Sequence, residues 1–153
     1  MEFFKWEDQY SLDIKLIDDQ HKCLIKIIND LHSSLISGTT NKIIEETLSS
    51  LIDYTIYHFN TEEEIFKFYK YPSYHDHKKQ HDVLARQVSE IQKKINDKSA
   101  TLSFEVMDFL VDWLVTHILS EDQEYGKYFR ENNIVVKNIL SKQSVGSVSY
   151  SCG

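Results

Sequence analysis

Apolar residues recur at steps of three and four along most of the chain, which is the period of amphipathic helices. The steps are most regular in residues 77–95, where Leu84, Val88, Ile91 and Ile95 share one face. Similar stripes run through residues 18–35, 41–69 and 102–128. The pattern therefore predicts four long helices.

Turn-forming residues separate these stripes. They occur in the Ser-Gly-Thr-Thr-Asn run at residues 37–41, at Pro72, and in the Asn-Asp-Lys-Ser run at residues 96–99. The connections are short, and short connections place successive helices side by side in opposite directions. We expect an all-α fold, namely an antiparallel up-down-up-down four-helix bundle.

The two ends of the chain differ in character. Residues 1–17 include Phe3, Phe4, Trp6 and Tyr10, so we expect an N-terminal arm that packs across the bundle. Residues 141–153 are rich in Ser and Gly, which predicts a disordered tail. We assign residues 1–140 to one domain.

Composition narrows the class of protein. A chain of 153 residues with 41% hydrophobic content can bury a core, and its formal charge of −7 disfavours binding to nucleic acid or anionic membranes. No apolar run reaches the roughly 20 residues of a membrane span, and the N-terminus does not resemble a secretory signal. We expect a cytoplasmic monomer in which Cys23 is a buried small residue and Cys152 is a free tail thiol.

Histidines and acids interrupt the apolar stripes at helical spacings. The pairs His58–Glu62 and His77–His81 are four residues apart, so both members of each pair face one neighbour. His117 and Asp122 are five apart, about 140° round an ideal helix. They need either a local π-type widening or a favourable reach by the shorter side chain to meet at one point. Buried histidines cost a few kcal/mol unless they find a partner. The candidate metal ligands are His21, His58, Glu62, His77, His81, His117 and Asp122.

This set suits two metal ions. If Glu62, Asp122 and one solvent oxygen bridge two six-coordinate ions, five histidines divide as three and two and leave one open position for a small diatomic molecule. The Glu-x-x-His pairs of ferritin-like bundles are absent. Lys78 stands where the H-E-x-x-H motif of zinc proteases has its catalytic Glu.

We do not expect the other polar residues near these motifs to bind the metal ions directly. His32 lies about 16 Å along the helix from His21, too far to share its metal, and His75 points away from His77. Tyr125 either donates to a bridging carboxylate or packs in the core. Of the Glu62-Glu63-Glu64 run, we expect the second and third residues to face solvent or to begin a salt-bridged surface.

The combined motifs resemble the hemerythrin family, in its single-domain bacterial form. The resemblance covers about residues 3–130. It is carried by Ile17-Asp18-Asp19-Gln20-His21, by His58-Phe59-Asn60-Thr61-Glu62-Glu63, by Tyr71-Pro72 followed by His77-Lys78-Lys79-Gln80-His81, and by the segment from Trp113 to Asp122.

The resemblance implies two non-haem iron ions joined by an oxo or hydroxo bridge. One iron would be held by His77, His81 and His117, and the other by His21 and His58, with Glu62 and Asp122 bridging. Dioxygen would bind at the second iron, beside an apolar pocket formed by Phe59, Trp113, Leu114 and Ile118.

The implied function is reversible dioxygen binding, for storage, buffering or delivery to oxygen-consuming enzymes, without turnover of a substrate. Two alternatives remain open. The chain could be a sensor that reports oxygen, nitric oxide or redox state to a partner, or a di-iron enzyme of the peroxidase type.

Overall fold

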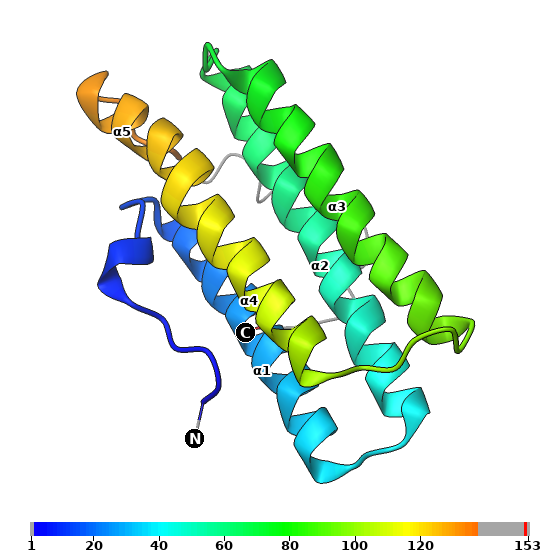
Figure 1. The fold of residues 1–153 in the computed structure, drawn as a ribbon. Helices are drawn as coiled ribbons and strands as arrows, with labels where there is room; N and C mark the ends of the chain where they lie inside the picture. Colours follow the sequence, from blue (N-terminus) through cyan, green and yellow to red (C-terminus); the bar gives the residue numbers. More distant parts are fainter. Residues whose placement is uncertain (1, 138–151, 153) are drawn as a thin grey trace.

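The computed structural model describes residues 2–137 and residue 152, and every regular element in this part of the chain is helical. Helices α1 (Lys15–Ser37), α2 (Asn41–Phe68), α3 (Tyr74–Asn96) and α4 (Phe104–His117) form a bundle. Helix α1 packs against α2 and α4, α2 packs against α3, and successive helices run in opposite directions (Figure 1). The all-α, up-down-up-down prediction is confirmed.

The fourth helical segment of the bundle is not one regular helix. After α4 the chain forms a single π-helical stretch, η2 (Ile118–Asp122), and then continues as α5 (Gln123–Glu131). The sequence pattern predicted one helix over residues 102–128 and, separately, a π-type widening between His117 and Asp122. The structure has that widening at the expected place.

Helix boundaries follow local chemistry. Helix α1 begins at Lys15, three residues before the predicted start, and ends at Ser37. The next residue, Gly38, adopts the left-handed conformation at φ 62° that glycine tolerates best. Helix α2 begins after Thr40, whose hydroxyl accepts a hydrogen bond from the Ile43 amide. It ends before Pro72, as predicted.

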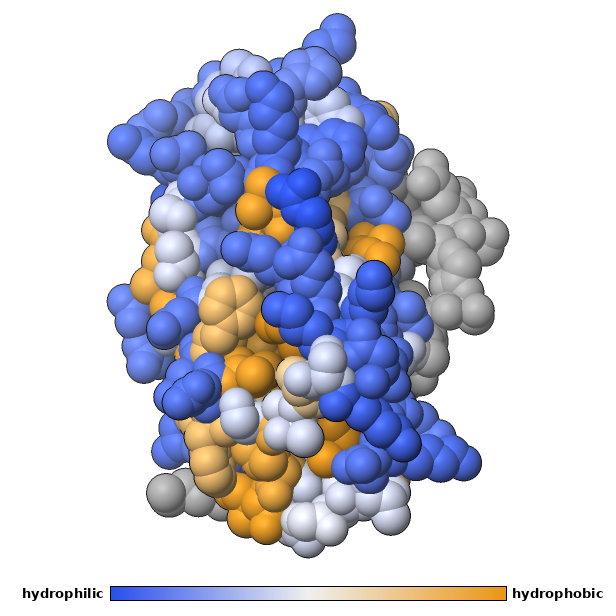
Figure 2. All heavy atoms as spheres, turned by 45° about the vertical axis from the view of Figure 1, so that its right-hand side comes forward, coloured by the Kyte–Doolittle hydropathy of each residue, from blue (hydrophilic) through white to orange (hydrophobic). Residues whose placement is uncertain are grey.

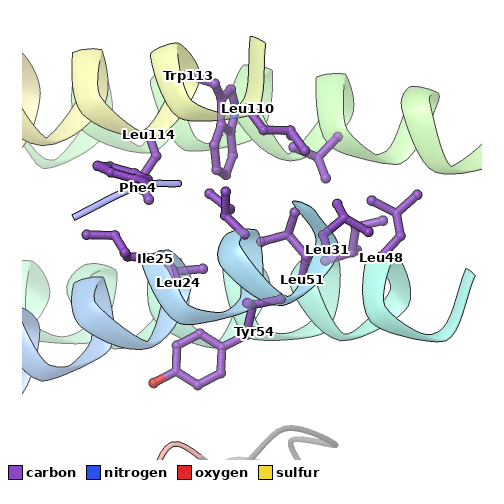
Figure 3. Packing of buried hydrophobic residues seen from close by; sticks show 14 of the residues in the cluster. Phe4, Leu24, Ile25, Leu31, Leu48, Leu51, Tyr54, Leu110, Trp113 and Leu114 are labelled. Atoms are coloured by element: carbon purple, nitrogen blue, oxygen red, sulfur yellow. The ribbon is translucent and has the colours of Figure 1, made fainter. Parts of the chain in front are cut away.

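The interior contains two apolar clusters, one towards each end of the bundle. In the larger cluster, leucines from three helices interleave, among them Leu24, Leu31, Leu51 and Leu110 (Figure 3). Burial of each such side chain stabilises the fold by about 1.5–3 kcal/mol. The smaller cluster contains Leu12, Ile17, Ile65, Phe66, Tyr71, Tyr125 and Phe129.

The order of residues along the helices places the predicted ligands between these clusters. Along α1, Ile17 belongs to the smaller cluster, His21 comes next, and Leu24 begins the larger one. Along α2 the order is reversed, because the helix runs the other way. The candidate metal site therefore lies in a polar layer enclosed on both sides by apolar packing.

The N-terminal arm is tied to the bundle by side chains of α1. Asn29 exchanges two hydrogen bonds of 2.8 Å with the backbone of Phe4. Asp18 accepts from the Leu12 amide at 2.9 Å. Leu12 in turn lies against Gly126 of α5, where an added Cβ would come within 3.3 Å of the leucine side chain. The predicted packing of the arm is confirmed.

The cysteines correct one prediction. Cys23 of α1 is buried as expected, but it forms a disulfide with Cys152, with 5.5 Å between the two Cα atoms. The expected free tail thiol is therefore wrong, because a contact between residues 129 apart leaves no pattern in the sequence. The predicted disorder of residues 141–153 falls, apart from Cys152, outside the described residues.

Apolar side chains are not confined to the interior. One face of the molecule shows hydrophobic residues interspersed with hydrophilic ones (Figure 2). Phe104 and Phe109 of α4 are among the exposed large hydrophobic residues of the described chain. Among the residues described, no helix is long and apolar enough to cross a membrane.

Candidate metal centre

The seven predicted ligands, although distant in sequence, meet in the polar layer of the bundle. They come from all four helical segments of the bundle: one from α1, two from α2, two from α3, one from the end of α4 and one from η2. All are buried, with no more than 5% of any residue exposed. They are His21, His58, Glu62, His77, His81, His117 and Asp122.

These side chains form two overlapping groups. In each group the potential ligand atoms all lie within 4.8 Å of one another. The first group holds His77, His81 and His117, and the second holds His21 and His58. Both acids, Glu62 and Asp122, belong to each group. The division into three and two histidines is the one expected from the sequence.

Glu62 turns one oxygen towards each group. Its Oε1 lies 3.4 Å from Nε2 of His58 and 3.8 Å from Nε2 of His21. Its Oε2 lies 2.9 Å from Nε2 of His81 and 3.7 Å from Nε2 of His77. The carboxylate therefore spans the two groups.

Asp122, which lies in η2, spans the two ligand groups in the same way as Glu62. Its Oδ2 lies 3.1 Å from Nε2 of His21. Its Oδ1 lies 3.1 Å from Nε2 of His77 and 3.0 Å from Nε2 of His117. The two acids thus present the geometry of two bridging carboxylates.

The inward-facing atoms lack hydrogen-bond partners of suitable geometry within the described chain. This holds for the Nε2 atoms of all five histidines, for Oε2 of Glu62 and for both carboxylate oxygens of Asp122. Buried polar atoms left unsatisfied cost about 1–3 kcal/mol each. Imidazole nitrogens and carboxylate oxygens together suit iron and neighbouring transition metals. The residues present therefore fit a pair of bound cations.

Protonation within the layer agrees with this fit. Burial lowers the pKa of His58 to about 3, although Glu62 opposes the shift, so this imidazole is neutral and free to bind a metal. Burial also opposes ionisation of Glu62 and Asp122, but the adjacent histidines outweigh it and hold both carboxyl pKa values well below their usual range. Both acids are therefore carboxylates.

The raised pKa of His77 shows most clearly that the two buried carboxylates favour a positive charge beside them. Burial alone would lower its pKa, yet the neighbouring Asp122 and Glu62 raise that pKa to about 10. In the absence of a metal, a proton on His77 partly neutralises the two carboxylates. Metal ions would supply that charge and displace the proton.

Tyr125 both packs in the core and donates to a proposed bridge. Its hydroxyl lies 2.6 Å from Oε1 of Glu62 and its ring lies 4.7 Å from that of Phe66. Burial, followed by the nearby Glu62, raises the pKa of Tyr125 well above its usual value. The phenol therefore stays protonated and orients Glu62.

Sequence reasoning missed two residues that hold the ligands from outside. Oε1 of Gln20 lies 2.7 Å from Nδ1 of His58, and Oε1 of Glu63 lies 3.0 Å from Nδ1 of His81. Of the two expectations for Glu63, exposure to solvent is wrong, since the residue is only 8% exposed and points at α3. One signal could have found them: a metal-binding histidine donates the N–H of its second ring nitrogen to an acceptor, and polar residues next to the predicted ligands are candidates for that acceptor.

The four residues of the expected oxygen pocket are all buried in the larger apolar cluster. Phe59 stacks on His81 with ring centroids 3.9 Å apart and also contacts the rings of His58 and His117. The ring centroids of Trp113 and Phe59 are 6.4 Å apart. Leu114 and Ile118 belong to the same apolar cluster. Near its edge, a groove of about 320 Å³ between α3 and α4 is lined by Trp113 and His117.

The remaining histidines lie outside both ligand groups. His32 stacks on Phe3 of the arm, with ring centroids 3.9 Å apart. His75 is exposed beside Tyr74. Both positions agree with the expectation that neither residue is a ligand.

Comparison with known proteins agrees with this arrangement. The family model for the hemerythrin HHE cation binding domain matches residues 12–129. A bacteriohemerythrin from Stenotrophomonas maltophilia is 32% identical over 126 residues, covering 82% of this chain and 81% of the relative. Another, from Methylococcus capsulatus, is 36% identical over 83 residues, which cover 54% of this chain and 63% of the relative.

A solved structure extends the likeness to three dimensions. The structure of a wild-type hemerythrin superposes with a TM-score of 0.77 at 32% identity, covering 82% of this chain and 96% of that protein. The matched region contains every helix that contributes to the site. This chain belongs to the hemerythrin family.

Proposed function

We propose that the chain binds dioxygen reversibly at a pair of non-haem iron ions. His77, His81 and His117 would hold one ion, His21 and His58 would hold the other, and Glu62 and Asp122 would bridge them. When bound, the iron pair would supply the electrons that dioxygen takes up. Membership of the hemerythrin family supports iron and dioxygen as the metal and the ligand.

The observation that carries the proposal is the unequal division of buried histidines around two shared carboxylates. Each group has both acids, but one group has three histidines and the other has two. Two six-coordinate ions with one bridging solvent oxygen would then keep a single open position, beside His21 and His58. One vacancy suits a small diatomic molecule better than an organic substrate.

The surrounding side chains favour binding without further reaction. Phe59, Leu114 and Ile118 are buried and apolar, and exclusion of water slows loss of a reduced, charged oxygen species. The four residues expected to form the pocket, Phe59, Trp113, Leu114 and Ile118, carry no acidic or basic group that could act on a second substrate. We therefore infer a carrier, used for storage, buffering or delivery to oxygen-consuming enzymes, and not an enzyme.

The expected monomeric state and the expected cytoplasmic location remain predictions. Gel filtration of the iron-loaded chain tests the first. The Cys23–Cys152 disulfide argues against a cytoplasmic location, because persistent disulfides are rare in reducing compartments.

The test is a visible absorption spectrum of the iron-loaded chain. The protein is reduced without air, iron per chain is counted, and oxygen is admitted and then removed under vacuum. We expect two irons per chain and a charge-transfer band that appears with oxygen and disappears without it. A His58→Ala variant should lose the band before it loses the iron held by the three-histidine group.

The other outcomes are distinct. Immediate and irreversible oxidation of a two-iron protein would favour a sensor, and rapid repeated consumption of peroxide or nitric oxide would favour an enzyme. Failure to hold two irons would overturn the centre itself.

A further inference from the structure

The two ligand groups differ in the charge of the residue that supports them from outside. His81 directs Nε2 at the centre and Nδ1 at the carboxylate of Glu63, 3.0 Å away. His58 directs Nε2 at the centre and Nδ1 at the amide oxygen of Gln20, 2.7 Å away. One supporting acceptor is therefore an anion and the other is neutral.

Neighbouring contacts fix the orientation of the Gln20 amide. The hydroxyl of Thr61 donates to the carbonyl oxygen of Tyr57 at 2.9 Å, so its oxygen is left to accept from Gln20 Nε2 at 3.3 Å. This directs the amide NH₂ group at Thr61 and the amide oxygen at His58. His58 must then carry its proton on Nδ1, which frees Nε2 for a metal.

Glu63 is held in a comparable way from the neighbouring helix. Its side chain is mostly buried between α2 and α3, and its second oxygen lies 4.0 Å from Nζ of Lys78. The first oxygen accepts from His81. A carboxylate acceptor draws the Nδ1 proton more strongly than an amide does and makes the imidazole a better electron donor through Nε2.

We propose that Glu63 and Gln20 are positioning residues that make the two halves of the centre unequal. Through His81, the Glu63 carboxylate strengthens metal binding in the half with three histidines. Through His58, the Gln20 amide orients the ring without adding charge, so the half with two histidines is the weaker one. This inference rests on the proposed two-ion centre.

Zinc is a suitable probe because it adds no redox chemistry. The metal-free chain is titrated with Zn²⁺ against a competing chelator, and ¹H–¹⁵N spectra of the histidine rings show which Nε2 atoms become bound first. We expect His77, His81 and His117 to respond to the first equivalent and His21 and His58 to the second. The ring spectra also report whether each Nδ1 carries a proton.

Two isosteric substitutions exchange the charges. Glu63→Gln should weaken the tighter site by about 10-fold, the lower end of the effect usual for an outer hydrogen-bond partner. Gln20→Glu should strengthen the weaker site, and the double variant should reverse the order of filling. Glu64→Gln is the matched control, because that side chain is 44% exposed and pairs with Lys67; it should change neither site.

The possible failures are separable. A chain that bound two zinc ions with affinities that neither substitution changed, and in an order that the double variant kept, would overturn this inference alone. Equal losses at both sites in Glu63→Gln would also overturn it, since they would indicate a general structural defect. A chain that bound fewer than two ions would overturn the proposed centre and this inference with it.

Discussion

Asp122 lies five residues after His117, and yet its Oδ1 is 3.0 Å from Nε2 of His117. In a regular α-helix these side chains would point about 140° apart. The π-helical stretch Ile118–Asp122 removes most of that angle. It also lets Asp122 reach His21 of α1 with its other oxygen, at 3.1 Å.

The bridging role of Asp122 can be tested by Asp122→Asn. The amide keeps the shape of the side chain but replaces one of the two oxygens with an NH₂ group, which cannot bind a metal. We expect the metal content to fall from two ions per chain towards one, as measured by elemental analysis after desalting. Two ions held with unchanged affinity would contradict the bridge.

Tyr125→Phe isolates the hydrogen bond to Glu62. The ring keeps its contacts with Phe66 and Phe129, whereas Glu62 loses a donor at 2.6 Å. We expect metal affinity to fall by about 10-fold or more, as for other outer partners. Competition with a chelator measures this loss, and an unchanged affinity would show that the tyrosine serves packing only.

The apolar pocket can be tested by comparing two substitutions of Ile118. Valine and threonine have nearly equal volumes, but threonine adds a hydroxyl to a fully buried position. Ile118→Val should cost about 0.5–1.5 kcal/mol in stability and leave the oxygenated form long-lived. Ile118→Thr should oxidise irreversibly several-fold faster, because a polar group admits water and protons. Equal decay of the absorption band in the two variants would argue against the pocket.

The pH dependence of the metal-free chain follows from His58. Its folded-state pKa of about 3 lies below the ordinary value of 6.5, so between these pH values the unfolded chain binds a proton that the folded chain does not. Stability should therefore fall by about 1.5 kcal/mol from pH 6.5 to pH 5. His77, with its pKa raised to about 10, and His81, whose pKa is also raised, contribute the opposite dependence, mainly above pH 6.5. Urea denaturation at both pH values measures the slope, and His58→Gln should remove it.

The disulfide between Cys23 and Cys152 gives a prediction about stability. Closing a loop of this length restricts the unfolded chain, so its loss should cost about 2–5 kcal/mol. Cys152→Ser and treatment with a reductant should lower the denaturation midpoint equally. Two free thiols in protein purified without reductant would show that the bond is absent under those conditions.

The sequence by itself determined the helices and singled out the residues of the candidate metal centre. Apolar residues that recur every three to four positions, in a chain with so few glycines and prolines, form amphipathic helices. Candidate ligands four residues apart on such a helix share one face. The five-residue step from His117 to Asp122 even indicated the π-helical stretch, as one of two ways to bring these side chains together. These features are local, so they leave a trace in the order of residues.

Only the tertiary structure decided how the helices meet around those ligands. It turned Glu63 towards His81 instead of solvent, brought Gln20 to His58, joined Tyr125 to Glu62 and paired Cys23 with Cys152. Each of these contacts joins residues on different elements of the chain. The periodicity of one helix specifies which face is buried, but the partner on that face depends on the rotation and depth at which the neighbouring helix packs.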